Sequence, residues 1–162
     1  MNTISNSEDF ITKLVNDYSD TMYRVAYNIT KNREDALDVC QEVFIRLIKS
    51  IGKIKDEAHL KAWLLRATVN CAKSNCVQAH KRHCISSESG EEISVCSDLE
   101  STELFDAVIR LPEKYRIVIH LFYYEDLTLA EISDVLKITK ASVKSRLFRA
   151  REMLRNTLER EN

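Results

Sequence analysis

Basic side chains gather near the C-terminal end of this 162-residue chain, around one aromatic residue. Residues 137–155 hold seven lysines and arginines and a single acidic residue. At about 100° per residue of helix, Lys144, Ser145, Phe148 and Arg149 share one face. An aromatic ring on a solvated basic face serves no purpose unless a partner docks there. We therefore interpret this face as a reader of duplex DNA, with Phe148 against a thymine methyl and the cations on guanine edges or phosphates.

Two neighbouring cations extend the same candidate surface. Lys140 lies in the first turn of the expected helix, and Arg146 lies beside its apolar stripe, where phosphate contact and simple packing are both open. The stripe itself should face a hydrophobic core and comprises Val143, Leu147, Ala150, Leu154 and Leu158. The alternative to DNA binding is a charged, solvated helix face with one stray aromatic residue.

A second candidate surface combines an amide, an aromatic ring and cations. On a helix expected between residues 59 and 80, one stripe carries Trp63, Arg66, Asn70 and Lys73. Such a combination suits an unstacked nucleic-acid base and its backbone. Taken alone, Trp63 is more typical of a core residue. The same helix is apolar on two other sides, so we expect it to lie between neighbouring helices.

A third surface is acidic with an apolar centre. On a helix expected over residues 34–49, Asp35, Asp38, Gln41 and Glu42 turn away from the core, with Ile45 among them. A polar rim around an apolar residue is typical of a protein-binding surface. A simple solvated face remains the alternative.

The basic helix is preceded by the layout of a helix-turn-helix. Thr128 and Glu131 match a capping box, in which Thr caps the helix start and Glu reaches back to it. The helix that they open is expected over residues 129–136, followed by the turn Lys137-Ile138-Thr139 and then the longer basic helix. A short helix, a three-residue turn and a longer helix are the arrangement that inserts into a DNA groove.

Composition favours an all-helical protein. Hydrophobic residues make up 44% of the chain and charged residues 30%, with only 2 Gly and 1 Pro. This scarcity of turn formers argues against sheets. Further helices are expected from Phe10 to Ile29, from 57 to 82, up to Pro112, and from Pro112 to Tyr124. No apolar run is long enough for a membrane span and no export signal begins the chain, so we expect a soluble cytoplasmic protein without membrane insertion.

An acidic segment divides the chain. Residues 85–105 contain six acidic residues and no Lys or Arg. We predict two small helical domains, residues 1–84 and 102–162, joined by a flexible acidic linker over 85–101. A long surface loop within one domain is the alternative.

The residues give little support to catalysis or metal binding. The five cysteines lack framework spacing and are expected to be reduced thiols. A zinc site from Cys76, His80, His83 and Cys84 would need a break in the helix or a second chain, because Cys76 and Cys84 lie about 12 Å apart along the helix axis. Neither a glycine-rich phosphate loop nor a nucleophile–histidine–acid pattern is present, so we expect neither an enzyme nor a cofactor.

Five segments together resemble bacterial RNA polymerase sigma factors of the extracytoplasmic-function (ECF) group. Residues 35–44 (DALDVCQEVF) are similar to the polymerase-binding helix, and residues 62–70 (AWLLRATVN) to the promoter-melting segment. Residues 111–116 (LPEKYR), 124–128 (YEDLT) and 143–150 (VKSRLFRA) are similar to the helix-turn-helix domain. The resemblance covers nearly the whole chain and implies two helical domains.

The resemblance implies a role for each of the three surfaces. The acidic helix, with Asp35, Asp38, Gln41, Glu42 and Ile45, would bind the clamp helices of the polymerase β′ subunit. Trp63, Arg66, Asn70 and Lys73 would hold the single-stranded −10 element and a flipped-out base. The −35 element would be read as duplex by Lys140, Lys144, Ser145, Arg146, Phe148 and Arg149. The β subunit and an anti-sigma factor would be further partners.

The helix-turn-helix turn departs from the pattern of the family. Members often carry Gly at this turn, where the present chain has Lys137. A left-handed backbone there would cost Lys about 1 kcal/mol.

A stand-alone DNA-binding regulator is the other interpretation. Such a protein binds its duplex tightly without polymerase, whereas a sigma factor gains specificity only on the core enzyme. Its first domain would sense a ligand or dimerise.

Overall fold

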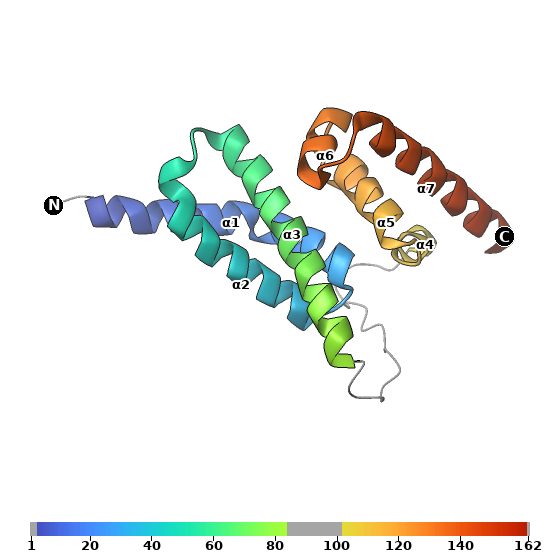
Figure 1. The fold of residues 1–162 in the computed structure, drawn as a ribbon, viewed down its shortest axis with the longest axis horizontal. Coiled ribbons are helices and arrows are strands. Elements are labelled where there is room, and N and C mark those ends of the chain that lie inside the picture. The colour runs from blue at the N-terminus through green and yellow to red at the C-terminus, as the bar shows by residue number, and fades with distance from the viewer. Residues whose placement is uncertain (1–2, 84–101, 162) are drawn as a thin grey trace.

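The computed structural model describes residues 3–83 and 102–161, with side chains from 8 to 78 and from 102 to 161 (Figure 1). Within these ranges the regular elements are all helical. The expectation of an all-α protein is therefore confirmed. The predicted linker over residues 85–101 lies outside the described residues. None of the described helices combines the length and apolar character needed to cross a bilayer.

Three long helices form the N-terminal half. They are α1 (Thr3–Thr30), α2 (Arg33–Ser50) and α3 (Glu57–His83), with a 3₁₀ turn η1 (Ile51–Lys53) after α2. Side chains cap two of the starts: the Asn32 side chain accepts from the Asp35 amide at 3.0 Å, and Asp56 accepts from the His59 amide at 2.7 Å. Each cap pairs an amide that the first helical turn leaves without an intrahelical acceptor.

The C-terminal half is built from shorter helices. They are α4 (Glu103–Ile109), α5 (Glu113–Ile119), α6 (Leu129–Leu136) and α7 (Lys140–Glu161), with a π-helical turn η2 (His120–Tyr124) after α5. Pro112 stands at the N-cap of α5, where its missing N–H costs no hydrogen bond. The helix expected from Pro112 to Tyr124 is thus confirmed, with its last turn widened.

The helix-turn-helix prediction is confirmed in detail. Thr128 and Glu131 form both hydrogen bonds of the capping box at the start of α6. After α6 the chain turns at Lys137, whose φ of 53° and ψ of 46° are left-handed. The Ser133 hydroxyl donates to the Ile138 carbonyl at 2.6 Å, and the Thr139 hydroxyl accepts from the Ser142 amide to cap α7. The turn is therefore held by side chains on both sides of a strained residue.

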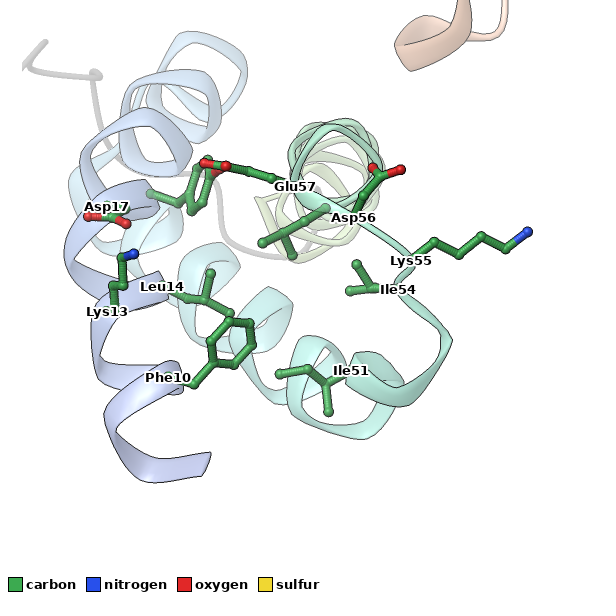
Figure 2. Close-up of a pocket in the computed structure, with 11 residues that line it drawn as sticks. Phe10, Lys13, Leu14, Asp17, Ile51, Ile54, Lys55, Asp56 and Glu57 are labelled. Carbon is green, nitrogen blue, oxygen red and sulfur yellow. The ribbon is translucent and has the colours of Figure 1, made fainter. Parts of the chain in front are cut away.

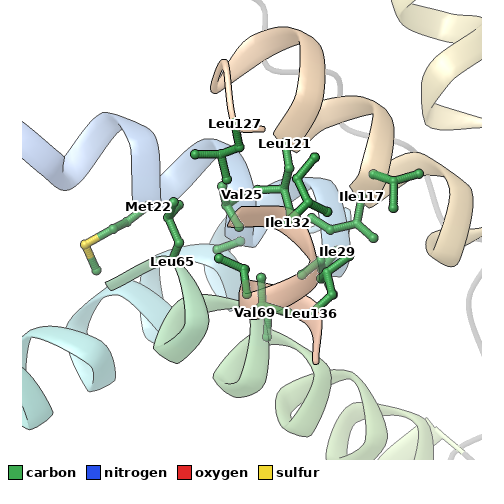
Figure 3. Packing of buried hydrophobic residues seen from close by; sticks show 14 of the residues in the cluster. Met22, Val25, Ile29, Leu65, Val69, Ile117, Leu121, Leu127, Ile132 and Leu136 are labelled. Carbon is green, nitrogen blue, oxygen red and sulfur yellow. The ribbon is translucent and has the colours of Figure 1, made fainter. Parts of the chain in front are cut away.

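The two halves share one hydrophobic core, which the sequence did not predict (Figure 3). Helix α6 packs against α3, and α5 packs against α1. We call this contact the interdomain interface. Its buried side chains are Met22, Val25, Ile29, Leu65 and Val69 of the N-terminal half and Ile117, Leu121, Leu127, Ile132 and Leu136 of the C-terminal half. The expected position of α3 between neighbouring helices is thereby confirmed, since it contacts α1, α2 and α6.

Buried polar groups cross the same interface. The Arg116 guanidinium, 3% exposed, donates to the Asn28 carbonyl at 2.5 Å and to the Leu111 carbonyl at 2.7 Å. The buried Glu125 carboxylate lies 3.2 Å from His120 Nε2 and 3.4 Å from Arg24 Nε of α1. A buried carboxylate requires such partners. Each half thus supplies a partner for a buried polar group of the other half.

Candidate nucleic-acid and protein interfaces

The basic face of α7 projects into solvent. Lys140, Lys144, Ser145, Phe148 and Arg149 are exposed, and the Phe148 ring is 61% exposed. On the opposite side Val143, Leu147 and Ala150 are buried against α5 and α6. The helical-wheel prediction for both faces is confirmed. Because its inner face is fixed, α7 presents the outer side chains as a rigid ridge.

Arg146 and Arg149 differ in their surroundings. Arg146 is half-buried, which suits either packing or a phosphate contact. The Arg149 side chain hydrogen-bonds the Tyr115 hydroxyl and lowers the pKa of that phenol. This bond restrains the guanidinium and lowers its side-chain entropy.

On α3 the four candidate residues for a single strand share one face but differ in exposure. Asn70 is exposed, whereas Trp63, Arg66 and Lys73 are half-buried. Trp63 packs against the core, as the alternative interpretation of this residue anticipated. Arg66 Nε is buried without a hydrogen-bond partner among the described residues. The four side chains therefore share one face of α3, but three of them are only partly accessible to solvent.

The acidic face of α2 is more apolar than the sequence analysis recognised. Asp38, Gln41, Glu42 and Ile45 are exposed and Asp35 is half-buried. Leu37 and Ile48 are also exposed, and with Gln41 and Ile45 they follow the spacing of one helix face. That spacing was the signal that could have identified Leu37 and Ile48. Glu42 is paired with Arg46 at 2.8 Å, an exposed ion pair that contributes little to stability.

An open pocket of about 330 Å³ lies at the far end of the N-terminal half (Figure 2). Phe10 and Leu14 of α1 face Ile51 and Ile54, which lie between α2 and α3. Charged side chains of both signs form its rim, and Tyr18 donates to Glu57 at 3.5 Å. The lining includes none of the candidate residues on α2, α3 or α7.

The described cysteines are packed rather than reactive. Burial raises the pKa of the Cys40 thiol to about 11 and also raises the pKa values of Cys71 and Cys76. Among the described residues no cluster of His, Cys, Asp and Glu is able to hold a metal ion. The side chains of His80 and His83 and the whole of Cys84 lie outside the described part of the chain, so the zinc alternative is untested there.

Two models of known families match the chain. "Sigma-70 region 2" matches residues 14–82, which cover the N-terminal half, and "Sigma-70, region 4" matches residues 101–154, which include the helix-turn-helix. The surfaces on α2 and α3 lie in the first match and the basic face of α7 lies in the second.

Similar proteins of comparable length carry the same description. RNA polymerase sigma factor SigV of Bacillus subtilis is 29% identical, over 91% of this chain and 90% of its own. ECF RNA polymerase sigma factor SigM of the same species is 31% identical, over 85% of this chain and 88% of its own. A solved structure of the sigma factor RpoE of Bartonella quintana, in complex with the anti-sigma factor NepR, matches with a TM-score of 0.76. At 18% identity over 94% of this chain and 98% of that one, this match shows the fold alone. By its two family matches and its relatives, the chain belongs to the ECF group of RNA polymerase sigma factors, the initiation factors that direct the core enzyme to promoters.

Proposed function

We propose that α2 is the surface by which this sigma factor binds the core enzyme, on the clamp helices of the β′ subunit. The observation that supports it is the exposed apolar line of Leu37, Ile45 and Ile48 beside the acidic residues Asp38 and Glu42. Apolar side chains exposed in a row are typical of a protein interface, and the carboxylates beside them give it a preferred partner charge. Asp35 and Gln41 complete the proposed contact.

For the −10 element, the proposed surface is the face of α3. The Asn70 amide is exposed and can pair with the edge of an extruded base, and Arg66 and Lys73 would hold its phosphates. Trp63 supports the face from the core side. Extruding a base costs a few kcal/mol of stacking, which such a site offsets.

For the −35 element, the proposed reader is α7 in the major groove. Phe148 and Arg149 contact base edges, with Lys140, Lys144, Ser145 and Arg146 on bases or on the phosphates that set the register. We further propose that the C-terminal half contacts the polymerase β subunit.

We also propose that the halves separate when both promoter elements are bound. Elements about 25 base pairs apart are separated by about 85 Å of B-form DNA. Helices α3 and α7, of 27 and 22 residues, are about 40 and 33 Å long and both contact α6. Together the two helices are shorter than this distance, which supports a separation of the halves when both elements are bound.

The remaining partners follow from the relatives. The RpoE structure contains an anti-sigma factor, and we propose that this chain also has one. We propose that it acts in the cytoplasm, on the polymerase there, and that it has no catalytic activity of its own.

Run-off transcription of fragmented genomic DNA by core polymerase, with and without this protein, tests the proposed function. Discrete new transcripts that share two upstream elements are expected. Tight, specific duplex binding by a folded chain that does not associate with core would instead support the stand-alone regulator.

A further inference from the structure

A cavity of about 160 Å³ lies between α1 and the C-terminal half. Tyr23 and Tyr27 of α1 line it together with Phe105 and Tyr124 of the C-terminal half. For comparison, a protein cavity of about 150 Å³ is large enough to hold one benzene molecule. Tyr124 is 50% exposed, so part of the lining reaches the protein surface. The cavity therefore has the volume of a single-ring molecule.

Aromatic rings make up much of the lining of this cavity. The Tyr23 and Tyr27 rings stack with their centroids 6.0 Å apart and 25° between their planes. The Tyr124 ring stacks on the His120 ring with the centroids 5.3 Å apart. Stacked and edge-on contacts between rings are favourable beyond the apolar area that they bury. This lining therefore favours an aromatic ligand over an aliphatic one of the same volume.

One polar atom beside these rings is unpaired. Asn28 is 5% exposed and lines the cavity, and its Oδ1 atom is buried without a hydrogen-bond partner within the described part of the chain. Native structures leave few buried polar atoms in this state, because each costs free energy. The main-chain carbonyl of Asn28 accepts a hydrogen bond from the buried Arg116, which restrains the backbone at this position. A ligand with one hydrogen-bond donor would give the Oδ1 atom the partner that it lacks.

The charged and titratable side chains that line the cavity have partners within the protein. Arg24 and His120 are among the lining residues. Arg24 Nε lies 3.4 Å from Glu125 Oε1, and His120 Nε2 lies 3.2 Å from the same oxygen. A charged ligand would have to compete for these partners after it had lost its own hydration. The site therefore favours a neutral molecule.

We propose that the cavity binds a neutral, single-ring aromatic molecule that carries one hydrogen-bond donor. Phenol is the simplest member of this class. Its ring lies against the tyrosine rings of the lining, and its hydroxyl donates to Asn28 Oδ1. The lining includes no residue of α2, α3 or α7, so the site is separate from the proposed polymerase and DNA surfaces. The inference therefore does not depend on the proposed function.

Asn28→Leu tests the polar contact. Leucine is close to asparagine in size but offers no acceptor, so a hydroxyl in the cavity of this variant has no partner. Toluene has the shape of phenol and no donor, and its affinity therefore measures binding by the apolar lining alone. Benzoate adds a negative charge to a similar ring and tests the preference for a neutral molecule.

Ile109→Phe tests the location of the site. Ile109 lines the cavity from α4, and a larger side chain at this position fills part of its volume. Leu104→Phe is the matched control, because it adds the same ring to the same helix at an exposed position outside the cavity. Thermal melting checks that each variant is folded.

Isothermal titration calorimetry of the full-length chain with phenol, toluene and benzoate measures the affinities. We expect one phenol molecule to bind per chain, about fivefold more tightly than toluene, which is the gain from one neutral hydrogen bond. Benzoate should not bind. The NMR signal of the Asn28 side-chain amide should shift as phenol is added.

The variants separate the two parts of the proposal. Asn28→Leu should bind phenol and toluene about equally, because the acceptor is gone. Ile109→Phe should bind both about tenfold more weakly, because a close-packed interior leaves no room for the ring. Leu104→Phe should match the unmodified chain. If Asn28→Leu does not fold, the Ile109→Phe comparison and the amide signal still test the site.

Three results would overturn the inference. The first is the absence of saturable phenol binding to the unmodified chain. The second is a phenol affinity that Ile109→Phe leaves unchanged, which would place the ligand outside the cavity. The third is equal binding of phenol and toluene by the unmodified chain, because Asn28 would then not select a hydrogen-bond donor.

Discussion

The guanidinium of Arg116 donates a hydrogen bond to the main-chain carbonyl of Asn28, 2.5 Å away and 88 residues earlier. Asn28 lies in the last turn of α1, where carbonyl groups lack intrahelical donors. A second bond from Arg116 reaches the Leu111 carbonyl at the turn between α4 and α5. The Arg116 side chain therefore links the C-terminal end of α1 in one half to the turn between α4 and α5 in the other half. Burial lowers the pKa of this arginine from its usual value without removing its charge at neutral pH.

Arg116→Lys should lower the free energy of unfolding by about 2 kcal/mol, because an ammonium group cannot serve both carbonyls and one stays buried and unpaired. Urea denaturation at pH 7 measures the change. Arg110→Lys, at an exposed ion pair, is the control and should be within about 0.5 kcal/mol of the unmodified chain. Equal stabilities for the two variants would refute a structural role for the Arg116 bonds.

Phe148→Ala should leave stability unchanged, because the ring is 61% exposed and exposed substitutions fall within about 0.5 kcal/mol. Its effect should be on the choice of −35 base, since the ring is proposed to contact a base in the major groove. Transcription from a −35 library compares the preferences of the two proteins. A uniform loss across all sequences would assign the ring to general packing on DNA instead.

The double change Leu37→Ser and Ile48→Ser should weaken association with core polymerase at least tenfold. Both side chains are about half exposed, so their removal should not disturb the fold. Circular dichroism checks the fold, and native gel shift with core enzyme measures association. Asp38→Arg with Glu42→Arg should also prevent association, through charge. Unchanged association in both double variants would exclude α2 as the binding surface.

Glu125 should make the chain less stable in acid. Burial by itself raises the pKa of its carboxyl, but the hydrogen bond and charge of His120, together with Arg24, outweigh burial and hold the pKa below its usual value of 4.5. A lowered folded-state pKa adds stability above pH 4.5 that is lost as pH falls through the folded value. The difference in unfolding free energy between the unmodified chain and Glu125→Gln should therefore shrink between pH 5 and pH 3. A constant difference over that range contradicts the linkage.

Lys137→Gly should stabilise the helix-turn-helix by up to about 1 kcal/mol, because glycine adopts the left-handed conformation without a side-chain clash. The observed φ of 53° is in that region. Thermal melting of the full chain measures the gain. Lys140→Gly, in the first turn of α7, is the matched control and should destabilise instead. A loss of stability in Lys137→Gly would show that the lysine side chain holds the turn.

Periodicity was sufficient to predict the helices, and Thr128, Glu131 and Pro112 marked starts that the structure confirms. The strained Lys137 was also foreseen, because the resemblance placed Gly at that turn. The interdomain interface was not foreseen. Nothing in the local sequence distinguishes Leu65, which faces the other half, from Leu64, which faces the core of its own half. Arg116 and Glu125 likewise look like ordinary surface charges until their partners, 88 and 101 residues earlier in the chain, are known. The roles of the site residues remain predictions.

The chain between α3 and α4 makes docking of the halves an association within one molecule. Two bodies joined in one chain meet at an effective concentration that does not depend on how dilute the protein is. The interdomain interface then needs only weak intrinsic affinity to stay closed. Cleavage of the backbone at any point between residues 84 and 101 would replace that local concentration with the far lower concentration of the free fragments. A cut there would let the two halves part, with the described helices of each half left whole.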